Sequence, residues 1–292
     1  MKLKYFTKYF LILFSLLCIS CNETSKPEYL TVGIFNIEWL GDGIDDNKPR
    51  TDEDIRQIAD IITSSGMEII AVQEIENETA LAKIVNKMDG FKLKVAKQQG
   101  KQRLGIIYKD YITVNEIGVY EPLSLNGRTR TGYIVDVAKN DYKLLMLIVH
   151  LKATSRFDST EALKIESRMM RHAQAEIISN WADSILFVCG IKEFAIVGDF
   201  NDYPTRIHNR TLEPIIKNEN LHFLTSDLRS CKNPLIWFLI DHIVVSTETK
   251  KRYVPNSVFV YDFHSMLNES EAERISDHCP ISVQLKIKSN LK

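Results

Sequence analysis

The sequence contains one stretch that decides its fold, Ala195-Ile196-Val197-Gly198-Asp199-Phe200-Asn201-Asp202. A short apolar run that stops abruptly in a carboxylate, an apolar residue and a carboxamide predicts a buried β-strand. Side chains alternate along an extended chain, so Asp199 and Asn201 are expected to lie on the same side of the strand end. Ligand crevices of α/β proteins form at such strand ends. The stretch therefore predicts a polar site at the edge of a sheet.

A second stretch near the C-terminus also places polar residues next to an apolar run. An acid and an imidazole, Asp277 and His278, stand side by side just before the apolar run 281–285. Burying such groups costs free energy unless they are paired or bind a cation. Polar strand ends exposed in loops would be a simpler explanation, and for either stretch alone the two explanations are about equal. Both stretches in one chain favour a metal-assisted site.

Length and composition indicate one large domain. The chain has 292 residues, which is near the upper size for a single hydrophobic core. It contains no internal repeat, no low-complexity run and no long linker that would mark an internal boundary. We therefore expect a single domain over residues 29–292.

The N-terminus resembles a bacterial lipoprotein signal. Lysines in the first eight residues precede an apolar segment, 10–19, that is too short to span a bilayer comfortably. We expect residues 1–20 to be a signal peptide, Cys21 to be lipidated and residues 21–28 to act as a polar tether. Cys18 stands where a leucine is usual, so a plain secretory signal and an uncleaved anchor are alternatives. In each case the protein is expected to function outside the cytoplasm.

Removal of the predicted signal peptide changes the net charge of the chain and the number of its cysteines. Loss of three lysines lowers Lys+Arg from 37 to 34 against 38 Asp+Glu, so the mature net charge is 34 − 38 = −4. Such a domain has no overall basic field that would attract nucleic acid, so a polyanion would need a local basic strip and a bound cation. The remaining cysteines are Cys189, Cys231 and Cys279, which permit one disulfide but imply no disulfide framework. We expect a monomer whose contact with a membrane is limited to the lipid anchor.

Hydrophobic periodicity predicts interleaved strands and helices. Helical spacing of apolar residues predicts helices over residues 52–65, 78–88 and 159–185. Short apolar runs predict strands over residues 30–37, 69–72, 104–108, 133–137, 144–149, 194–197, 243–245, 258–260 and 281–285. This order favours an α/β fold in which two sheets pack together and helices flank them.

The longest predicted helix, 159–185, carries an apolar stripe that is expected to face a sheet. Its members are Leu163, Met170, Ala173, Ile177, Trp181 and Ile185. Arg168 and Arg171 lie on the same helix, where a solvent-exposed face is the expected position for charged residues.

Polar residues recur at the ends of six predicted strands, in a pattern that resembles a known family. The chain resembles the endonuclease/exonuclease/phosphatase superfamily, which has the DNase I-like fold. The similar motifs span residues 29–286 in the family's order and are Phe35-Asn36-Ile37-Glu38, Gln73-Glu74, Ile148-Val149-His150-Leu151, Gly198-Asp199-Phe200-Asn201, Ile240-Asp241-His242-Ile243 and Ser276-Asp277-His278. This resemblance implies a four-layered α/β sandwich and Mg²⁺-dependent cleavage of a phosphate ester.

The resemblance also implies a set of metal ligands. A hard cation offsets charge on the phosphoryl and leaving oxygens, and oxygen ligands suit Mg²⁺, with Mn²⁺ or Ca²⁺ as alternatives. Glu74 is the first expected ligand and Glu38 the second. The residues expected to complete or share the coordination are Asn36, Asp199, Asn201 and Asp277.

Catalytic roles follow from the same motifs. Asp199 is expected to accept the proton of the attacking water, and Asn201 to orient that water or donate to a phosphoryl oxygen. His278 would contact the scissile phosphate with Asp241 fixing its ring. His150 would protonate or stabilise the leaving oxygen.

The residues expected around His150 and around the phosphate match those of the family less completely. In similar deoxyribonucleases a carboxylate supports the histidine that corresponds to His150, whereas this chain has Gln102 at the aligned position. Arg130 resembles a phosphate-contacting arginine of the nuclease branch, and Arg103 lies near the same strand ends.

Three functions are therefore open. The first is a secreted, tethered endonuclease that cleaves DNA or RNA. The second is a phosphatase or a sphingomyelinase-like phospholipid phosphodiesterase, for which Trp237-Phe238 is the single candidate for an exposed aromatic hairpin. The residues before Asp241 do not match the inositol-polyphosphate phosphatase branch. The third, a non-catalytic binding module, is disfavoured because every catalytic position holds a competent residue.

Overall fold

The computed structural model describes residues 28–155 and 157–288. The predicted signal peptide, Cys21 and the tether up to residue 27 lie outside the described residues. Over the described part of the chain, no helix combines the length and the apolar character needed to cross a membrane.

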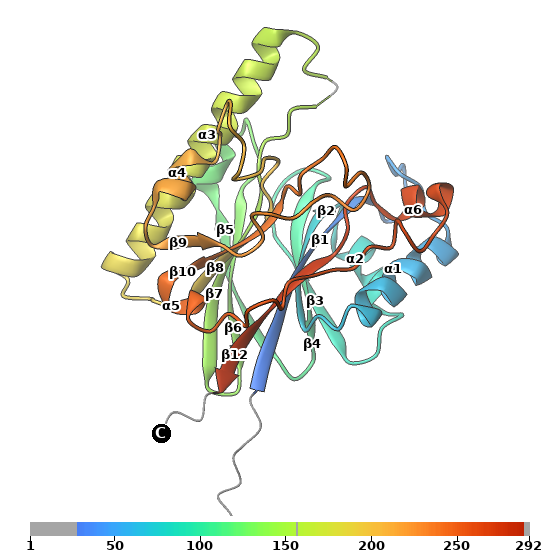
Figure 1. Cartoon of the computed structure of the whole chain (residues 1–292). Helices are drawn as coiled ribbons and strands as arrows, with labels where there is room; N and C mark the ends of the chain where they lie inside the picture. The colour runs from blue at the N-terminus through green and yellow to red at the C-terminus, as the bar shows by residue number, and fades with distance from the viewer. Residues whose placement is uncertain (1–27, 156, 289–292) are drawn as a thin grey trace, which may run out of the picture.

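Two six-stranded mixed sheets pack face to face and helices cover their outer faces, in the layers that Figure 1 shows from side to side. The first sheet has the order β11-β12-β1-β2-β4-β3, with bounds β1 (Glu28–Leu40), β2 (Ile69–Ile75), β3 (Phe91–Val95), β4 (Arg103–Lys109), β11 (Phe259–Val260) and β12 (Ile281–Lys288). The second has the order β5-β6-β7-β8-β10-β9, with bounds β5 (Thr113–Tyr120), β6 (Gly132–Lys139), β7 (Tyr142–His150), β8 (Phe194–Asp199), β9 (Leu221–Phe223) and β10 (Asp241–Ser246). The predicted four-layered α/β sandwich is confirmed.

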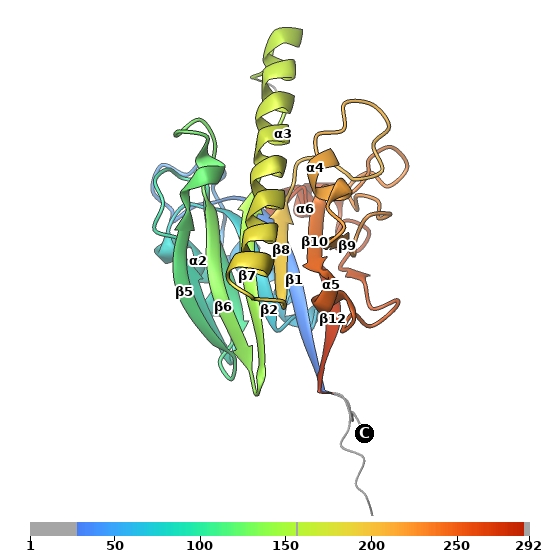
Figure 2. The same ribbon diagram turned by 90° about the vertical axis from the view of Figure 1, so that its left-hand side faces the viewer.

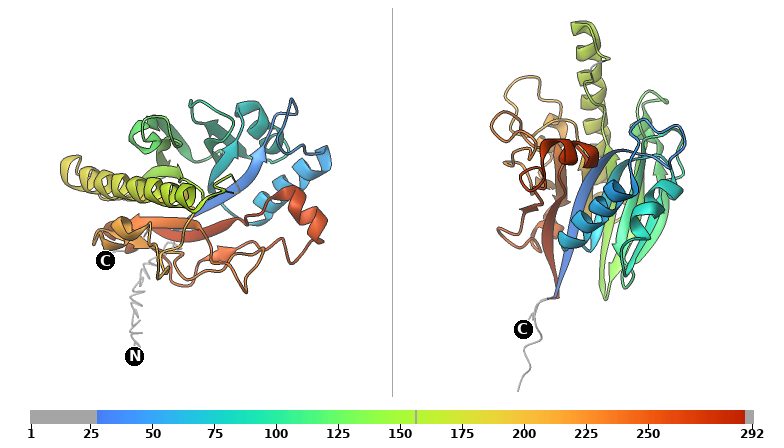
Figure 3. Two further views of the ribbon diagram at one scale, coloured as in Figure 1. Left: turned by 90° about the horizontal axis from the view of Figure 1, so that it is seen from above. Right: turned by 90° about the vertical axis from the view of Figure 1, so that its right-hand side faces the viewer.

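The helices divide between the two outer faces. Against the first sheet pack α1 (Asp52–Ser64), α2 (Glu78–Val85) and α6 (Glu269–Ile275), of which Figure 3 shows α1 and α6. The second sheet is covered by α3 (Glu161–Asp183) and α4 (Glu213–Lys217); α3 runs across its outer face in Figure 2. The short helix α5 (Thr247–Lys250) follows β10.

The sequence explains why α1 forms where it does. Thr51 caps its first turn, because the threonine side chain accepts a hydrogen bond from Asp54 N while the Asp54 carboxylate accepts one from Thr51 N. Ile55, Ile58 and Ile62 then fall on one face and are buried against the sheet.

Strand directions bring the polar strand ends together. The pairs β1/β2 and β7/β8 are parallel, so within each sheet two carboxyl ends lie side by side. β10 runs antiparallel to β8 and pairs Asp241 with Asp199, and β12 runs antiparallel to β1. The starts of β10 and β12 therefore lie at the same edge as the ends of the parallel strands.

The predicted stripe on α3 is correct only toward its C-terminal end, where Trp181 is buried and Ile177 and Ile185 pack against the core. The buried residues of this helix are Ser167, Arg171, Gln174, Ala175, Ile178, Trp181 and Ala182. Leu163 is exposed, because the first turns of α3 extend beyond the sheets, as Figure 1 shows. Arg171 is also not on a solvent-exposed face: it is 4% exposed and donates to Thr211 Oγ1 and to the carbonyl of Lys152.

The cysteines that are described form one disulfide, between Cys231 and Cys279, while Cys189 is free and exposed. The permitted disulfide is therefore present. It joins the long connection between β9 and β10 to the residue that follows His278.

Candidate active site

The strand ends that carry the site are irregular. The register of β1 against β2 shifts between Asn36 and Leu40, and Glu38 (φ +48°) and Trp39 (φ +55°) adopt left-handed backbone conformations. Glu74 does the same at φ +62°. Such conformations cost free energy in non-glycine residues and cluster at functional sites, and bulges re-aim side chains. The strand ends are thus shaped to present Glu38 and Glu74.

Arg50 stabilises the bulge of β1. Its guanidinium donates to the carbonyl groups of Ile37, Glu38 and Trp39, and also to that of Ile275 at the end of α6. Burial lowers the pKa of Arg50 to about 10, and neighbouring carboxylates, Glu38 first, oppose that shift. Arg50 therefore links the strand end that carries Glu38 to the segment that leads into Asp277 and His278.

Asn36, Glu74 and Asp199 meet at the centre of the site. Asn36 Nδ2 donates to Asp199 Oδ2 at 3.1 Å and lies 3.4 Å from Glu74 Oε1. Trp39 N donates to the other Glu74 oxygen, Oε2, at 3.1 Å, which fixes the carboxylate. The two sheets thus contribute facing carboxylates, Glu74 from β2 and Asp199 from β8.

Asp199 is buried, and its two oxygens have different partners. Oδ1 accepts a hydrogen bond from Asn201 N at 2.7 Å, while Oδ2 faces Asn36. Burial and the charge of Asp241 raise the pKa of Asp199 to about 7, against the opposing effects of His278 and of the Asn201 N–H. A carboxylate with a pKa near neutrality is suited to accept a proton at physiological pH.

Asn201 is held beside Asp199 in a left-handed conformation, at φ +53°. Its side-chain Nδ2 donates to the carbonyl of Leu151 at 3.1 Å. Nδ2 carries a second N–H, so the Asn201 side chain can still donate a hydrogen bond as well as accept one.

His278 and Asp241 form a tight pair. His278 Nδ1 donates to Asp241 Oδ2 at 2.6 Å, and His278 Nε2 lies 3.9 Å from Asp199 Oδ2. Burial alone would lower the pKa of His278, but Asp241, Asp199 and Asp277 together raise it well above its usual value. The imidazole is therefore a cation that presents Nε2 to the site.

His150 behaves in the opposite way. Its Nε2 lies 3.4 Å from Asp199 Oδ2 and 3.8 Å from Glu74 Oε1, and its Nδ1 has no hydrogen-bond partner among the described residues. Burial lowers the pKa of His150 well below its usual value, and the charges of Arg130 and His278 lower it further. Two nearby carboxylates do not outweigh these effects, so His150 is neutral.

The missing support for His150 has a structural reason. Gln102, at the position where similar deoxyribonucleases carry a carboxylate, accepts a hydrogen bond from Arg130 through Oε1. Arg130 also lies 3.4 Å from the carbonyl of Leu151, and burial lowers its pKa. Gln102 therefore orients Arg130 and not His150.

An open cleft of about 1050 Å³ lies over these residues. Its walls include three basic side chains, Lys48, Arg130 and Lys152. The structure does not bring Arg103 to this cleft, because its side chain turns back and donates to the carbonyl of Gly100 at 3.2 Å.

The donor set suits a hard divalent cation. Glu74 and Asp199 offer carboxylate oxygens at the centre of the site, whereas Asn36 faces them through Nδ2, because its Oδ1 accepts from Glu38 N at 3.0 Å. Glu38 and Asp277 stand at the margin, where Glu38 accepts from Asp277 N at 3.0 Å. Glu38 is also paired with Lys48. Ligand atoms of Asp199, Asp241 and His278 likewise lie within 4.8 Å of one another, but the His278 and Asp241 atoms that face each other are already hydrogen-bonded, which leaves the Glu74 side as the better site.

Several residues of the site were not predicted. Arg50, Lys48 and Trp39 have no pattern around them that differs from an ordinary loop or strand end. Gln102 was noted, but not as the partner of Arg130. The one sequence signal for Lys48 is its position in the segment that follows the Asn36-x-Glu38 motif.

Comparison with known proteins identifies the family. The sequence profile of the Endonuclease/Exonuclease/phosphatase family matches residues 33–278. The chain belongs to this family. Its members are metal-dependent phosphoesterases, and so is this enzyme. No curated protein matches the sequence.

Solved structures with the same fold include proteins of different specificity. TDP2 from Caenorhabditis elegans, in truncated form, aligns with a TM-score of 0.61 at 15% identity, over 88% of this chain and 98% of that one. D. rerio TDP2 complexed with a single-strand DNA product gives 0.63 at 13%, over 88% and 98%. A mannosyl-6-phosphatase from Bacteroides thetaiotaomicron gives 0.59 at 16%, over 87% and 98%. At these identities the likeness shows the fold alone.

Proposed function

We propose that this enzyme is a Mg²⁺-dependent phosphodiesterase that cleaves nucleic acid, as an endonuclease. The observation that carries the proposal is the convergence of Glu74, Asp199 and His278, whose ring Asp241 holds, in one open cleft. Carboxylate oxygens on the floor and basic side chains on the walls are the arrangement that a phosphodiester with a bound cation requires.

The residues of the site would have separate roles in metal binding, water activation and charge stabilisation. Glu74, with Glu38, would hold Mg²⁺, which would offset negative charge on the phosphate when bound. Asn36 would join them through Oδ1 after a half-turn of its side-chain amide, which now presents Nδ2 to the site. Asp199 would accept the proton of the attacking water, since one of its oxygens is fixed by Asn201 N and the other faces the site. The cationic His278 would stabilise a phosphoryl oxygen through Nε2.

Of the two roles that the family resemblance implies for His150, protonating or stabilising the leaving oxygen, we favour the second. A neutral imidazole lacks the extra proton that would be transferred to the leaving alcohol oxygen. Its Nε2–H can still donate a hydrogen bond to that oxygen. We therefore propose that His150 stabilises the leaving oxygen and that water completes its protonation.

The width and lining of the cleft support a polymeric substrate. Its volume of about 1050 Å³ is at the upper end for small-molecule pockets. Lys48 and Lys152 extend the basic wall beyond Arg130, where phosphates that flank the scissile one would lie. The TDP2 structure with a single-strand DNA product is consistent with such a substrate.

A sugar-phosphate phosphatase is the second candidate. The predicted mature charge of −4 provides no general attraction for a polyanion, and one structural neighbour is a mannosyl-6-phosphatase. A monoester would use the same floor of the cleft and would not need Lys48 or Lys152.

A panel of substrates separates the two candidates. The purified domain would be incubated with plasmid DNA, single-stranded DNA, RNA, sphingomyelin and hexose 6-phosphates in Mg²⁺, each with and without chelator. Internal cleavage of DNA or RNA supports the proposal. Turnover confined to hexose phosphates or to phospholipid contradicts it, and Lys152→Ala should then leave that turnover unchanged.

We further propose that the protein is an extracytoplasmic lipoprotein tethered through Cys21 and that its domain is a monomer. Metabolic labelling with a fatty acid, compared between the wild type and Cys21→Ala, tests the anchor. Sedimentation of the domain tests the oligomeric state. Unlabelled wild-type protein or a stable dimer would refute the respective part.

A further inference from the structure

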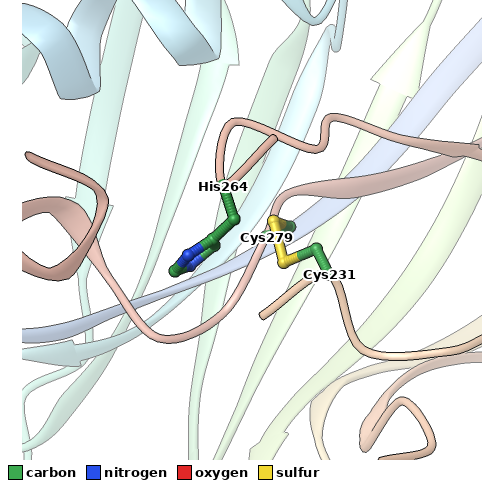
Figure 4. A group of neighbouring side chains, drawn as sticks. All are labelled: Cys231, His264 and Cys279. Carbon is green, nitrogen blue, oxygen red and sulfur yellow. A yellow bond between two sulfur atoms is a disulfide. The ribbon is translucent and has the colours of Figure 1, made fainter. Parts of the chain in front are cut away.

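A group of three soft donors lies beside the active site and has no role in the chemistry described above. It consists of Cys231, Cys279 and His264, which Figure 4 shows together. Cys231 belongs to the connection between β9 and β10, His264 follows β11, and Cys279 precedes β12. Their ligand atoms lie within 4.8 Å of one another, although 48 residues separate the two cysteines.

One ring nitrogen of His264 has a backbone partner, which leaves the other able to bind a metal. Its Nε2 lies 2.9 Å from the carbonyl oxygen of Ser276. A carbonyl can only accept a hydrogen bond, so Nε2 carries the proton and Nδ1 keeps its lone pair. Donation of the second ring N–H to a carbonyl is the arrangement that fixes the tautomer of histidines that bind metals. Stacking on Phe263, with ring centroids 4.7 Å apart, further restricts the ring.

In the oxidised protein the two sulfur atoms are bonded to each other. Reduction by a dithiol delivers two electrons and two protons, cleaves the S–S bond and leaves a thiol on each cysteine, while the reductant becomes a disulfide. Coordination of a divalent metal then releases one proton from each thiol.

The geometry fits a tetrahedral metal. Zn–S distances of about 2.3 Å and Zn–N distances of about 2.0 Å separate the ligand atoms of a tetrahedral site by roughly 3.3–3.8 Å. Donors that already lie within 4.8 Å of one another reach these separations by side-chain rotation. The backbone positions that hold the disulfide can therefore also hold the metal.

We propose that Cys231, Cys279 and His264 form a redox-controlled zinc site, which is closed as a disulfide when oxidised and binds one Zn²⁺ when reduced. Three protein ligands leave the fourth position of the metal open to water. Cys279 is buried, whereas Cys231 and His264 are partly exposed, so the metal would enter from the side of Cys231 and His264. The proposal is independent of the substrate of the enzyme.

The proposed zinc site would restrain the segment that carries His278. Cys279 directly follows His278, and Ser276, which orients His264, lies two residues before it. Both the disulfide and a bound zinc ion would hold this segment to the β9–β10 connection, whereas the reduced, metal-free protein would lack that link.

Cobalt is a spectroscopic probe that tests the site without any activity assay. The full domain, oxidised or reduced with a phosphine, would be titrated with Co²⁺, because thiolate coordination gives a charge-transfer band that oxygen ligands do not give. We expect a band that reaches one equivalent in the reduced protein alone and disappears when Zn²⁺ is added. Co²⁺ at the carboxylates of the catalytic cleft would give no such band.

Three variants complete the experiment. Reduced Cys189→Ser, the control, should keep the band, because this exposed cysteine does not belong to the group. Cys231→Ser should lose it, and His264→Ala, which retains the disulfide and tests a folded protein, should bind Co²⁺ about 10-fold or more weakly. Absence of a band in the reduced wild type, or full binding by His264→Ala, would overturn the proposal.

Discussion

Replacing Asp241 with asparagine removes one charge from the His278–Asp241 pair and preserves its shape. The carboxylate lies 2.6 Å from His278 Nδ1; the Asp241 side chain is buried and that of His278 is 14% exposed. Removing one partner of a buried ion pair costs about 3–5 kcal/mol. If that cost falls on the transition state, kcat/KM decreases by roughly two to four decades, at about 1.4 kcal/mol per decade.

The pH dependence of the loss is the diagnostic feature. Burial lowers the pKa of His278, and Asp241 is the first of the groups that raise it well above its usual value. Without the Asp241 charge the pKa of His278 falls, so the imidazole is neutral at alkaline pH and regains its proton as the pH decreases. The loss in kcat/KM should therefore be largest near about pH 8 and smaller near about pH 6.

The assay is kcat/KM for the substrate that the panel identifies, measured across this pH range for the wild type and Asp241→Asn. Glu193→Gln likewise turns a carboxylate into an amide, just before the start of β8 and in the ion pair with Arg252, and should leave the profile unchanged. A loss that is equal at every pH, or no loss, would refute the assignment of His278 as a cation held by Asp241.

Three further predictions concern other parts of the account. Asp199→Asn and Asn201→Ala should each lower kcat by roughly two to four decades, and the double variant should lose much less than the product, because both act on one transition state; full additivity would mean that the two residues act independently. His242 is buried with its pKa lowered to about 4, so the unfolded chain takes up a proton before the folded one as the pH falls below about 6.5, and the free energy of unfolding should decrease by about 3 kcal/mol toward pH 4. Urea unfolding at several pH values should show a shallower decrease in His242→Gln than in the wild type, and equal slopes would exclude His242 as the source. Arg50→Met should lower the free energy of unfolding by about 3 kcal/mol or more, since several carbonyl groups lose a charged donor, and should weaken metal binding measured by calorimetry through misalignment of Glu38; unchanged stability would contradict the role of Arg50.

The sequence predicted the layers of the fold because they depend on apolar runs. Residues 69–72 and 194–197 become the buried centres of β2 and β8, and the parallel direction of their neighbours brings their polar ends to one edge. β3, β5 and β9 were missed because they are short or rich in polar residues, so alternation within them is weak.

Within the site, sequence motifs identified side chains but not their partners. Arg50 and Arg171 bind backbone carbonyl groups that folding brings from distant segments, and a charged residue in a loop or on a helix gives no sign of such burial. The left-handed conformations of Glu38 and Glu74 are likewise set by the bulge and its contacts. The same applies to Gln102, which directly precedes β4, because its partner Arg130 lies in the connection before β6 of the other sheet.

Metal dependence tests the central claim most directly. The wild type, Glu74→Gln and the control Glu68→Gln, which lies just before the other end of β2, would be stripped with chelator and assayed for phosphodiester hydrolysis as Mg²⁺ is added. The account predicts no activity without metal, recovery at the same Mg²⁺ concentration for the wild type and Glu68→Gln, and a requirement for more Mg²⁺ in Glu74→Gln, with partial rescue at saturation. Hydrolysis that survives chelation, or a Glu74→Gln enzyme that loses activity with an unchanged dependence on Mg²⁺, would contradict it.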